Sequence, residues 1–151
     1  TRGGKLMNSH LRSVPRLALG FFLVLHGLAH SPGVLGAWKL ADFEDVSYQP
    51  NILLEDASDG VVALLGVVWL VAGAAFVLAG LGLLRRAVWW PRMTLFAAVV
   101  SLAVATLWRE DAVVGLVIDI ALLVLLAGVL GRSLLTSVRV HRRGGNLPSS
   151  V

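Results

Sequence analysis

The chain has no cysteine, and only 15% of its residues are charged. The lack of cysteine excludes disulfides, thiolate metal sites, iron–sulfur clusters and haem attached through thioethers. The scarcity of charge excludes a soluble domain, because a folded domain of this size needs more polar surface than this composition supplies.

Common functional motifs are also missing. No glycine-rich loop follows a strand pattern, so there is no nucleotide-binding fingerprint, and no serine lies in a nucleophile elbow. A net charge of +4 could suggest a nucleic-acid partner. The basic residues lie at the ends of apolar runs, however, with no basic patch interleaved with aromatics, so we expect no nucleic-acid binding.

What the chain has is apolar sequence: 57% of its residues are hydrophobic, and the mean hydropathy is +0.82. Four apolar runs each approach the ~20 residues that a membrane-spanning helix needs. The sequence therefore predicts an all-α integral membrane protein, an antiparallel four-helix bundle in one domain. The expected spans are 14–38, 60–84, 92–108 and 112–131, between a basic N-terminal segment at 1–13 and a basic tail at 132–151.

Charge asymmetry predicts the orientation. The N-terminal segment, the link between the second and third spans, and the tail, counted together with Arg16 and Arg92 at the adjoining span ends, hold eleven of the thirteen Lys and Arg and none of the nine acids. By the positive-inside rule, both termini are expected in the cytoplasm, with the protein a multi-pass protein of the cell (inner, cytoplasmic) membrane. Met7 is a candidate start residue. The first run lacks a clear cleavage site, so we expect a retained span.

Prolines and polar residues predict local features. Ser13 is a candidate N-cap for the first span, with Pro15 in its first turn. Pro32 removes a backbone donor and predicts a kink or helix end near His30. The polar segment 39–59 could hold a short amphipathic helix, and the sequence after the tail's last arginines is expected to be disordered.

Small residues predict close helix packing. Gly66, Gly73 and Gly80 recur every seven residues on one slowly drifting face of the second span. Ala97, Ser101 and Ala105 form a small-xxx-small face on the third. Small residues allow neighbouring backbones to approach closely, and we expect both faces to pack on other helices.

Polar side chains inside the spans mark the candidate site. His26 and His30 share one face of the first span, and Asp119 lies in the fourth. Depth counted along the helices at ~1.5 Å per residue places His30, Asp119 and Ser101 in one layer, with His26 one turn deeper. Glu110 and Asp111 are interpreted as residues of a solvated turn.

Three interpretations of this cluster remain open. His26 and His30 could bind a divalent metal ion with Asp119 as a third ligand or an orienting carboxylate. A proton relay could run from Asp119 through His30 to His26. Alternatively, a histidine could hydrogen-bond Asp119 and Ser101 simply to fix the helix register.

The segments His26-Gly27-Leu28-Ala29-His30 and Trp108-Arg109-Glu110-Asp111-Ala112-Val113-Val114-Gly115 resemble small, uncharacterised four-span bacterial membrane proteins. These proteins share an H-G-x-x-H first helix, and the overall layout is similar to DoxX-type proteins. The chain departs from their pattern at Pro32 and at Asp119, where an apolar residue and an amide are expected. The resemblance implies a four-helix membrane fold and singles out the same histidines, but it implies no reaction.

Two functions follow as expectations. The first is a non-catalytic accessory or scaffolding subunit of a larger membrane complex, with other membrane subunits or further copies of the chain as partners. The alternative is a buried site of His26, His30 and Asp119 that binds a metal or small ligand, with a redox or proton-transfer role. Whether the protein is an enzyme stays open at this point.

Overall fold

The structure is a computed structural model that describes the backbone of residues 2–42 and 47–144, and the side chains of residues 14–42 and 47–128. All regular structure in these residues is helical. The predicted tail end, 145–151, lies outside the described residues. The five helices are α1 (Arg2–Leu28), α2 (Ser31–Ala37), α3 (Asp59–Leu84), α4 (Trp90–Leu107) and α5 (Val113–Gly144).

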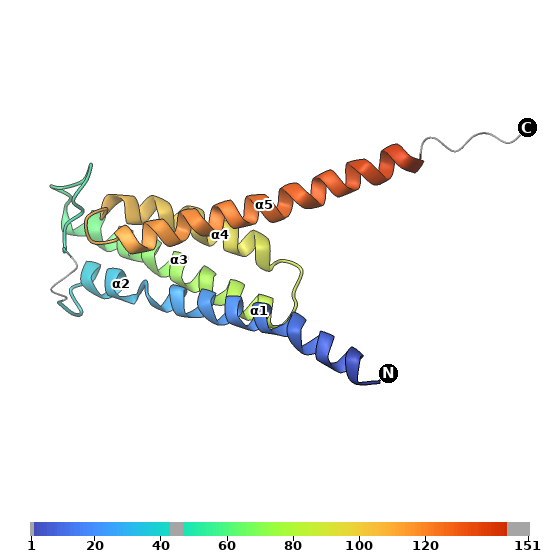
Figure 1. Cartoon of the computed structure of the whole chain (residues 1–151). Coiled ribbons are helices and arrows are strands. Elements are labelled where there is room, and N and C mark those ends of the chain that lie inside the picture. Colours follow the sequence, from blue (N-terminus) through green and yellow to red (C-terminus); the bar gives the residue numbers. More distant parts are fainter. Residues whose placement is uncertain (1, 43–46, 145–151) are drawn as a thin grey trace, which may run out of the picture.

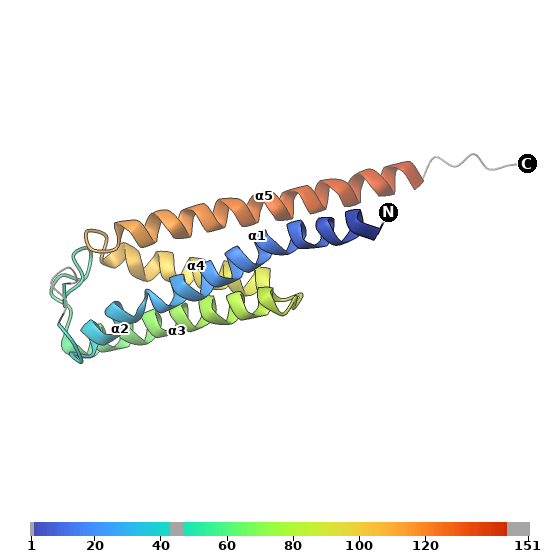
Figure 2. The same ribbon diagram turned by 60° about the horizontal axis from the view of Figure 1, so that its bottom comes forward.

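The helices lie side by side along one long axis (Figures 1 and 2). Helix α3 packs against α1 and α2 on one side and α4 on the other, and α5 packs against α4. The start of α1 and the end of α5 lie at the same end of the molecule (Figure 1). We call the opposite end, which carries residues 39–42 and 47–58 and the 108–112 turn, the loop end.

Three helical stretches are long and apolar enough to cross a membrane: Val14–Ala37, Asp59–Leu84 and Trp90–Leu107. Each lies within two residues of a predicted span. A fourth, Val113–Gly128, is apolar but shorter, and it opens the long helix α5. The sixteen residues of Val113–Gly128 extend about 24 Å along the helix axis.

Helix α1 begins earlier than predicted. It runs continuously from Arg2 with Pro15 inside it, so the expectation that Ser13 caps the first span is wrong. The break at Pro32 is confirmed. Helix α1 ends at Leu28, and α2 begins at Ser31 with the proline in its first turn, where a missing N–H costs no hydrogen bond.

Glycines bring α1 and α3 into backbone contact, as the seven-residue repeat predicted. A Cβ placed on Gly27 would lie 2.6 Å from the carbonyl oxygen of Gly73, and one on Gly73 would lie 2.7 Å from that of Gly27. About two turns away along α1, a Cβ on Gly80 would lie 2.6 Å from the carbonyl oxygen of Gly20, and one on Gly20 would meet the Leu84 side chain at 2.6 Å. The third glycine of the repeat, Gly66, faces Ala37 and Trp38.

The core lies mainly between α1, α3 and α4. The small-residue face predicted on α4 is confirmed, because Ala97, Ser101 and Ala105 are all buried. Small side chains allow the large Phe76 to be fully enclosed. The core residues are Leu23, Ala75, Phe76, Ala79, Leu83, Ala97, Ala98 and Leu122.

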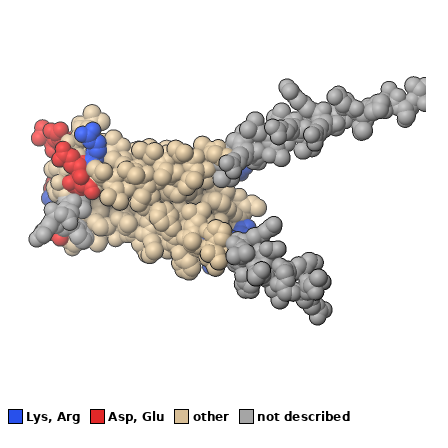
Figure 3. Space-filling model, in the orientation of Figure 1, with Lys and Arg blue, Asp and Glu red and all other residues tan. Residues whose placement is uncertain are grey.

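The polar segment between α2 and α3 has no helix in its described residues, 39–42 and 47–58, contrary to the expectation of a short amphipathic helix there. Instead, side chains anchor it. Lys39 donates to Asp59 at 2.9 Å, and Tyr48 donates to the same carboxylate at 2.8 Å. The hydrogen bond to Asp59 raises the pKa of Lys39 above its ordinary value. On the face seen in Figure 3, the acidic side chains gather at the loop end.

Candidate functional site

Helices α1 and α5 meet through a histidine and an aspartate. His26 Nε2 lies 3.1 Å from Asp119 Oδ1, and the two residues are 7% and 0% exposed. The contact joins residues 93 positions apart in the sequence. A buried carboxylate without a partner is costly, so this contact explains how Asp119 is accommodated in an apolar helix.

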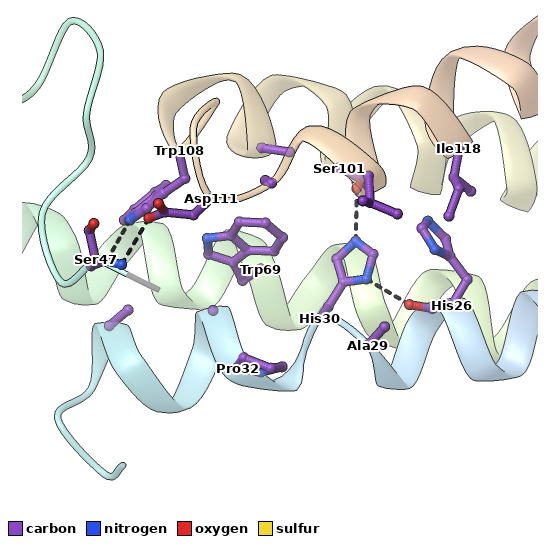
Figure 4. A pocket seen from close by; sticks show the side chains of 16 residues that line it. His26, Ala29, His30, Pro32, Ser47, Trp69, Ser101, Trp108, Asp111 and Ile118 are labelled. Atoms are coloured by element: carbon purple, nitrogen blue, oxygen red, sulfur yellow. Dashed lines mark hydrogen bonds between the residues drawn. The ribbon is translucent and has the colours of Figure 1, made fainter. Parts of the chain in front are cut away.

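His30 lies at the break between α1 and α2 and has a partner on each ring nitrogen. Nδ1 donates to the His26 carbonyl oxygen at 2.9 Å, and Nε2 lies 2.8 Å from Ser101 Oγ on α4. Because a carbonyl only accepts, Nδ1 carries the proton. In the neutral ring, Nε2 therefore accepts from the serine hydroxyl. Figure 4 shows this ring between the two partners.

The pairing differs from the predicted one. Asp119 pairs with His26, which was placed one turn deeper, and of Asp119 and Ser101 only the serine is bonded to His30. The two histidines are one helical turn apart, and depth counted from helix ends shifts by a turn when helices tilt. The predicted relay order is therefore wrong. His26 and His30 are joined through a backbone carbonyl, which has no proton to pass on.

Aromatic rings hold both imidazoles in place. Phe76 packs edge-on against His26 with ring centroids 4.6 Å apart, and it also lies 5.5 Å from His30. Trp69 packs against His30 at 5.4 Å. Gly33 makes room for this indole, since a Cβ there would lie 2.7 Å from the Trp69 ring.

A cavity of about 310 Å³ opens between these groups and the loop end. His26, His30 and Ser101 form its polar floor. In Figure 4 the floor lies on the right and the loop end on the left. Helices α1, α2, α3, α4 and α5 all contribute to the wall. The other lining residues are Ala29, Pro32, Gly33, Ala37, Ser47, Trp69, Ala105, Trp108, Asp111, Ala112, Val114, Gly115 and Ile118.

At the loop end of the cavity, the backbone of Ser47 makes two hydrogen bonds to other lining residues. Its N–H donates to Asp111 at 2.8 Å, and its carbonyl accepts from Trp108 Nε1 at 2.8 Å. Asp111 is exposed but has a structural partner, so interpreting it only as a residue of a solvated turn was incomplete. Neither tie was predictable, because no sequence pattern marks a backbone group of a loop as the partner of a distant turn.

Two buried polar atoms of this region have no hydrogen-bond partner in residues 14–42 and 47–128, whose side chains the structure describes. They are Trp69 Nε1 and Asp119 Oδ2. Most buried polar groups in proteins are satisfied, so each such atom calls for an explanation. Sequence reasoning did not single out Trp69. Its signal was a tryptophan in the interior of a span, away from the interface where this residue is usually enriched.

The metal interpretation has no support from the geometry. Among the described residues, no group of three or more His, Asp or Glu side chains is arranged to hold a metal ion. His30 uses one nitrogen on a carbonyl and the other on Ser101, and the His26 nitrogen nearest the carboxylate already faces Asp119. Metal binding by His26, His30 and Asp119 stays an untested prediction.

Comparison with known proteins adds no assignment. No family model, curated protein or solved structure matches the chain.

Proposed function

We propose that this chain spans the cell membrane four times, with both termini in the cytoplasm and the loop end outside. Three spans are supported by length and hydropathy, and the apolar start of α5 would supply the fourth. Large apolar side chains cover the outside of the helices, among them Leu25, Leu64 and Val117. Such a surface favours lipid as its surroundings.

Within that protein, we propose that the cavity between His30 and the loop end, which we call the cavity above His30, binds a small organic molecule. The observation that carries this proposal is the coincidence of a cavity with a polar floor and of Trp69, a lining residue whose buried Nε1 has no hydrogen-bond partner among the described residues. Ligand sites are concave, mostly apolar and furnished with a few polar groups, and 310 Å³ lies at the lower end of their usual volumes.

The floor would orient such a molecule. Ser101 gives its hydrogen to His30 Nε2, which leaves a lone pair on its oxygen, and His30 is fixed by the His26 carbonyl. Trp69 would provide a donor. The binding groups are therefore held rigidly before a ligand arrives, which lowers the entropic cost of binding.

Extraction of small molecules from the purified protein tests this function. Ala105 lines the cavity, so Ala105→Leu would fill part of it, whereas Ala103 lies on the exposed face of the same helix. Mass spectrometry of solvent extracts should find a molecule retained by the wild type and by Ala103→Leu and depleted at least tenfold in Ala105→Leu. Equal retention by both variants would refute a ligand in this cavity.

A second candidate is an accessory subunit of a membrane complex, and the open face of α5 favours it. Val124, Leu125 and Gly128 are exposed, and a Cβ on Gly128 would meet nothing within 4 Å. A partner helix could pack there closely. Native purification should then recover further subunits, and Gly128→Leu should release them. Wild-type protein that purifies alone would count against this role.

A further inference from the structure

We propose that the molecule bound above His30 is uncharged and lipid-soluble, carries a hydrogen-bond acceptor, and enters sideways from the bilayer between the α1–α2 break and α5. This inference rests on the proposed ligand site and specifies its ligand class and its route. Three features of the cavity carry it: the charge of its described lining, the hydrogen bonds across its loop end, and its open side.

The described residues around the cavity offer no unpaired charged side chain to an ionic ligand. Among them, Asp119 is the ionisable acid at the depth of the floor, and it is paired with His26. Asp111 is the only carboxylate among the described lining residues and accepts the Ser47 N–H at the rim, and no Lys or Arg is among these lining residues. An ion moved into this apolar site would lose hydration without a counter-charge, so a neutral molecule is favoured.

The unpartnered donor sets the chemistry of the ligand. Trp69 Nε1 is buried and has no acceptor among the residues that the structure describes. An indole nitrogen only donates, so a carbonyl, ether or hydroxyl oxygen on the ligand would satisfy it. The neighbouring ring of Trp108, 6.1 Å away, adds apolar contact surface.

The loop end is the less favourable entrance. The two hydrogen bonds of Ser47 tie the loop to Asp111 and Trp108 across this end. Trp108 itself is buried, at 3% exposure. A ligand arriving from water would meet these hydrogen-bonded groups first.

The side between α1–α2 and α5 is the more open one. Ala29 and Val114 line the cavity and are exposed, and they belong to these two walls. A Cβ on Gly115 would meet nothing within 4 Å. These residues lie in or beside apolar spans, so the opening would face acyl chains, where lipid-soluble molecules concentrate.

Thiol labelling tests the route, since a chain without cysteine allows each introduced thiol to be read alone. Ala105→Cys places a thiol in the cavity. Uncharged methyl methanethiosulfonate and a cationic, membrane-impermeant trimethylammonium methanethiosulfonate are added to intact cells. Both transfer a thioalkyl group to the thiol and release methanesulfinate. Mass spectrometry of the purified protein gives the labelling rate.

The proposal predicts that the uncharged reagent labels Ala105→Cys at least tenfold faster than the cationic one. Adding Gly115→Leu should slow the uncharged reagent at least tenfold, whereas Gly128→Leu, on the same helix and equally open, should not. If Gly115→Leu fails to fold, Val114→Trp narrows the same opening. Glu110→Cys, exposed at the loop end, must react with the cationic reagent, which verifies that this end faces the medium.

Each other result overturns the proposal in a distinguishable way. Equal labelling by the cationic reagent would place the entrance at the loop end while leaving the ligand site intact. Unchanged labelling after Gly115→Leu or Val114→Trp would exclude the lateral opening. No labelling by either reagent, with Ala97→Cys in the closed core equally silent, would mean that there is no accessible cavity, and the proposed function would fail with it.

Discussion

Helix α1 meets its two neighbours in opposite ways. Its backbone contacts the backbone of α3 at two places, where Gly27 meets Gly73 and where Gly20 meets Gly80. Towards α5, it makes a polar contact at His26, and a cavity of about 310 Å³ opens nearer the loop end. The difference teaches that glycine has two uses here. Gly27, which faces the backbone of α3, allows the two helices to touch, whereas Gly115, which has no neighbour within 4 Å of a Cβ, leaves space between α5 and α1.

The largest expected effect is a loss of stability at the close contact between α1 and α3. Gly27→Leu would drive a side chain into the Gly73 carbonyl, which cannot rotate away, and should cost about 3 kcal/mol of unfolding free energy or abolish folding. Gly115→Leu is the matched control on the open side, and its stability should change by no more than about 0.5 kcal/mol. Unfolding in detergent measures both. Similar losses would remove the contrast between the two sides.

A smaller effect is expected at the cavity floor. Ser101→Ala removes the donor to His30 Nε2 and should lower the unfolding free energy by about 0.5–1.5 kcal/mol. Ala98→Ser provides a control, because it exchanges the same two residue types at a fully buried position on the same helix where no hydrogen bond to an imidazole exists. If Ser101→Ala leaves stability unchanged and the His30 imidazole NMR signals unshifted, this hydrogen bond is absent.

The smallest stability effect separates binding from folding. Trp69→Phe keeps an aromatic ring but removes an N–H that has no partner in the described part of the chain, so stability should change by about 1 kcal/mol or less. Retention of the extracted molecule should nevertheless fall several-fold. Full retention by Trp69→Phe would show that the indole donor does not contact the ligand.

The sequence predicted the helical fold and most of the helix bounds, because runs of apolar residues and prolines act locally. It also predicted the glycine contacts of α3, since a seven-residue repeat keeps one face towards a neighbour. Ser13 was misread as a helix start. The chain before it is helical too, and a capping residue stabilises a helix end only where the preceding residues leave the helix.

The candidate site was predicted in its members but not in its pairing. Polar groups in apolar spans stand out, so His26, His30, Ser101 and Asp119 could all be named from the sequence. Their partners depend on tilt and on which turn of α1 faces α5, which the sequence does not encode locally. The roles of Trp69 and Ser47 depend on three-dimensional closure of the loop and were missed for the same reason.

The account depends on an imidazole of α1 and a carboxylate of α5 supporting each other beneath the cavity. A double-mutant cycle measures this directly, with unfolding free energies of the wild type, His26→Leu, Asp119→Leu and the double variant. Each single change leaves a buried polar group without its partner, whereas the double change leaves none. We predict a coupling of about 1–3 kcal/mol, with the double variant more stable than Asp119→Leu. Strictly additive losses would contradict the contact and the site built on it.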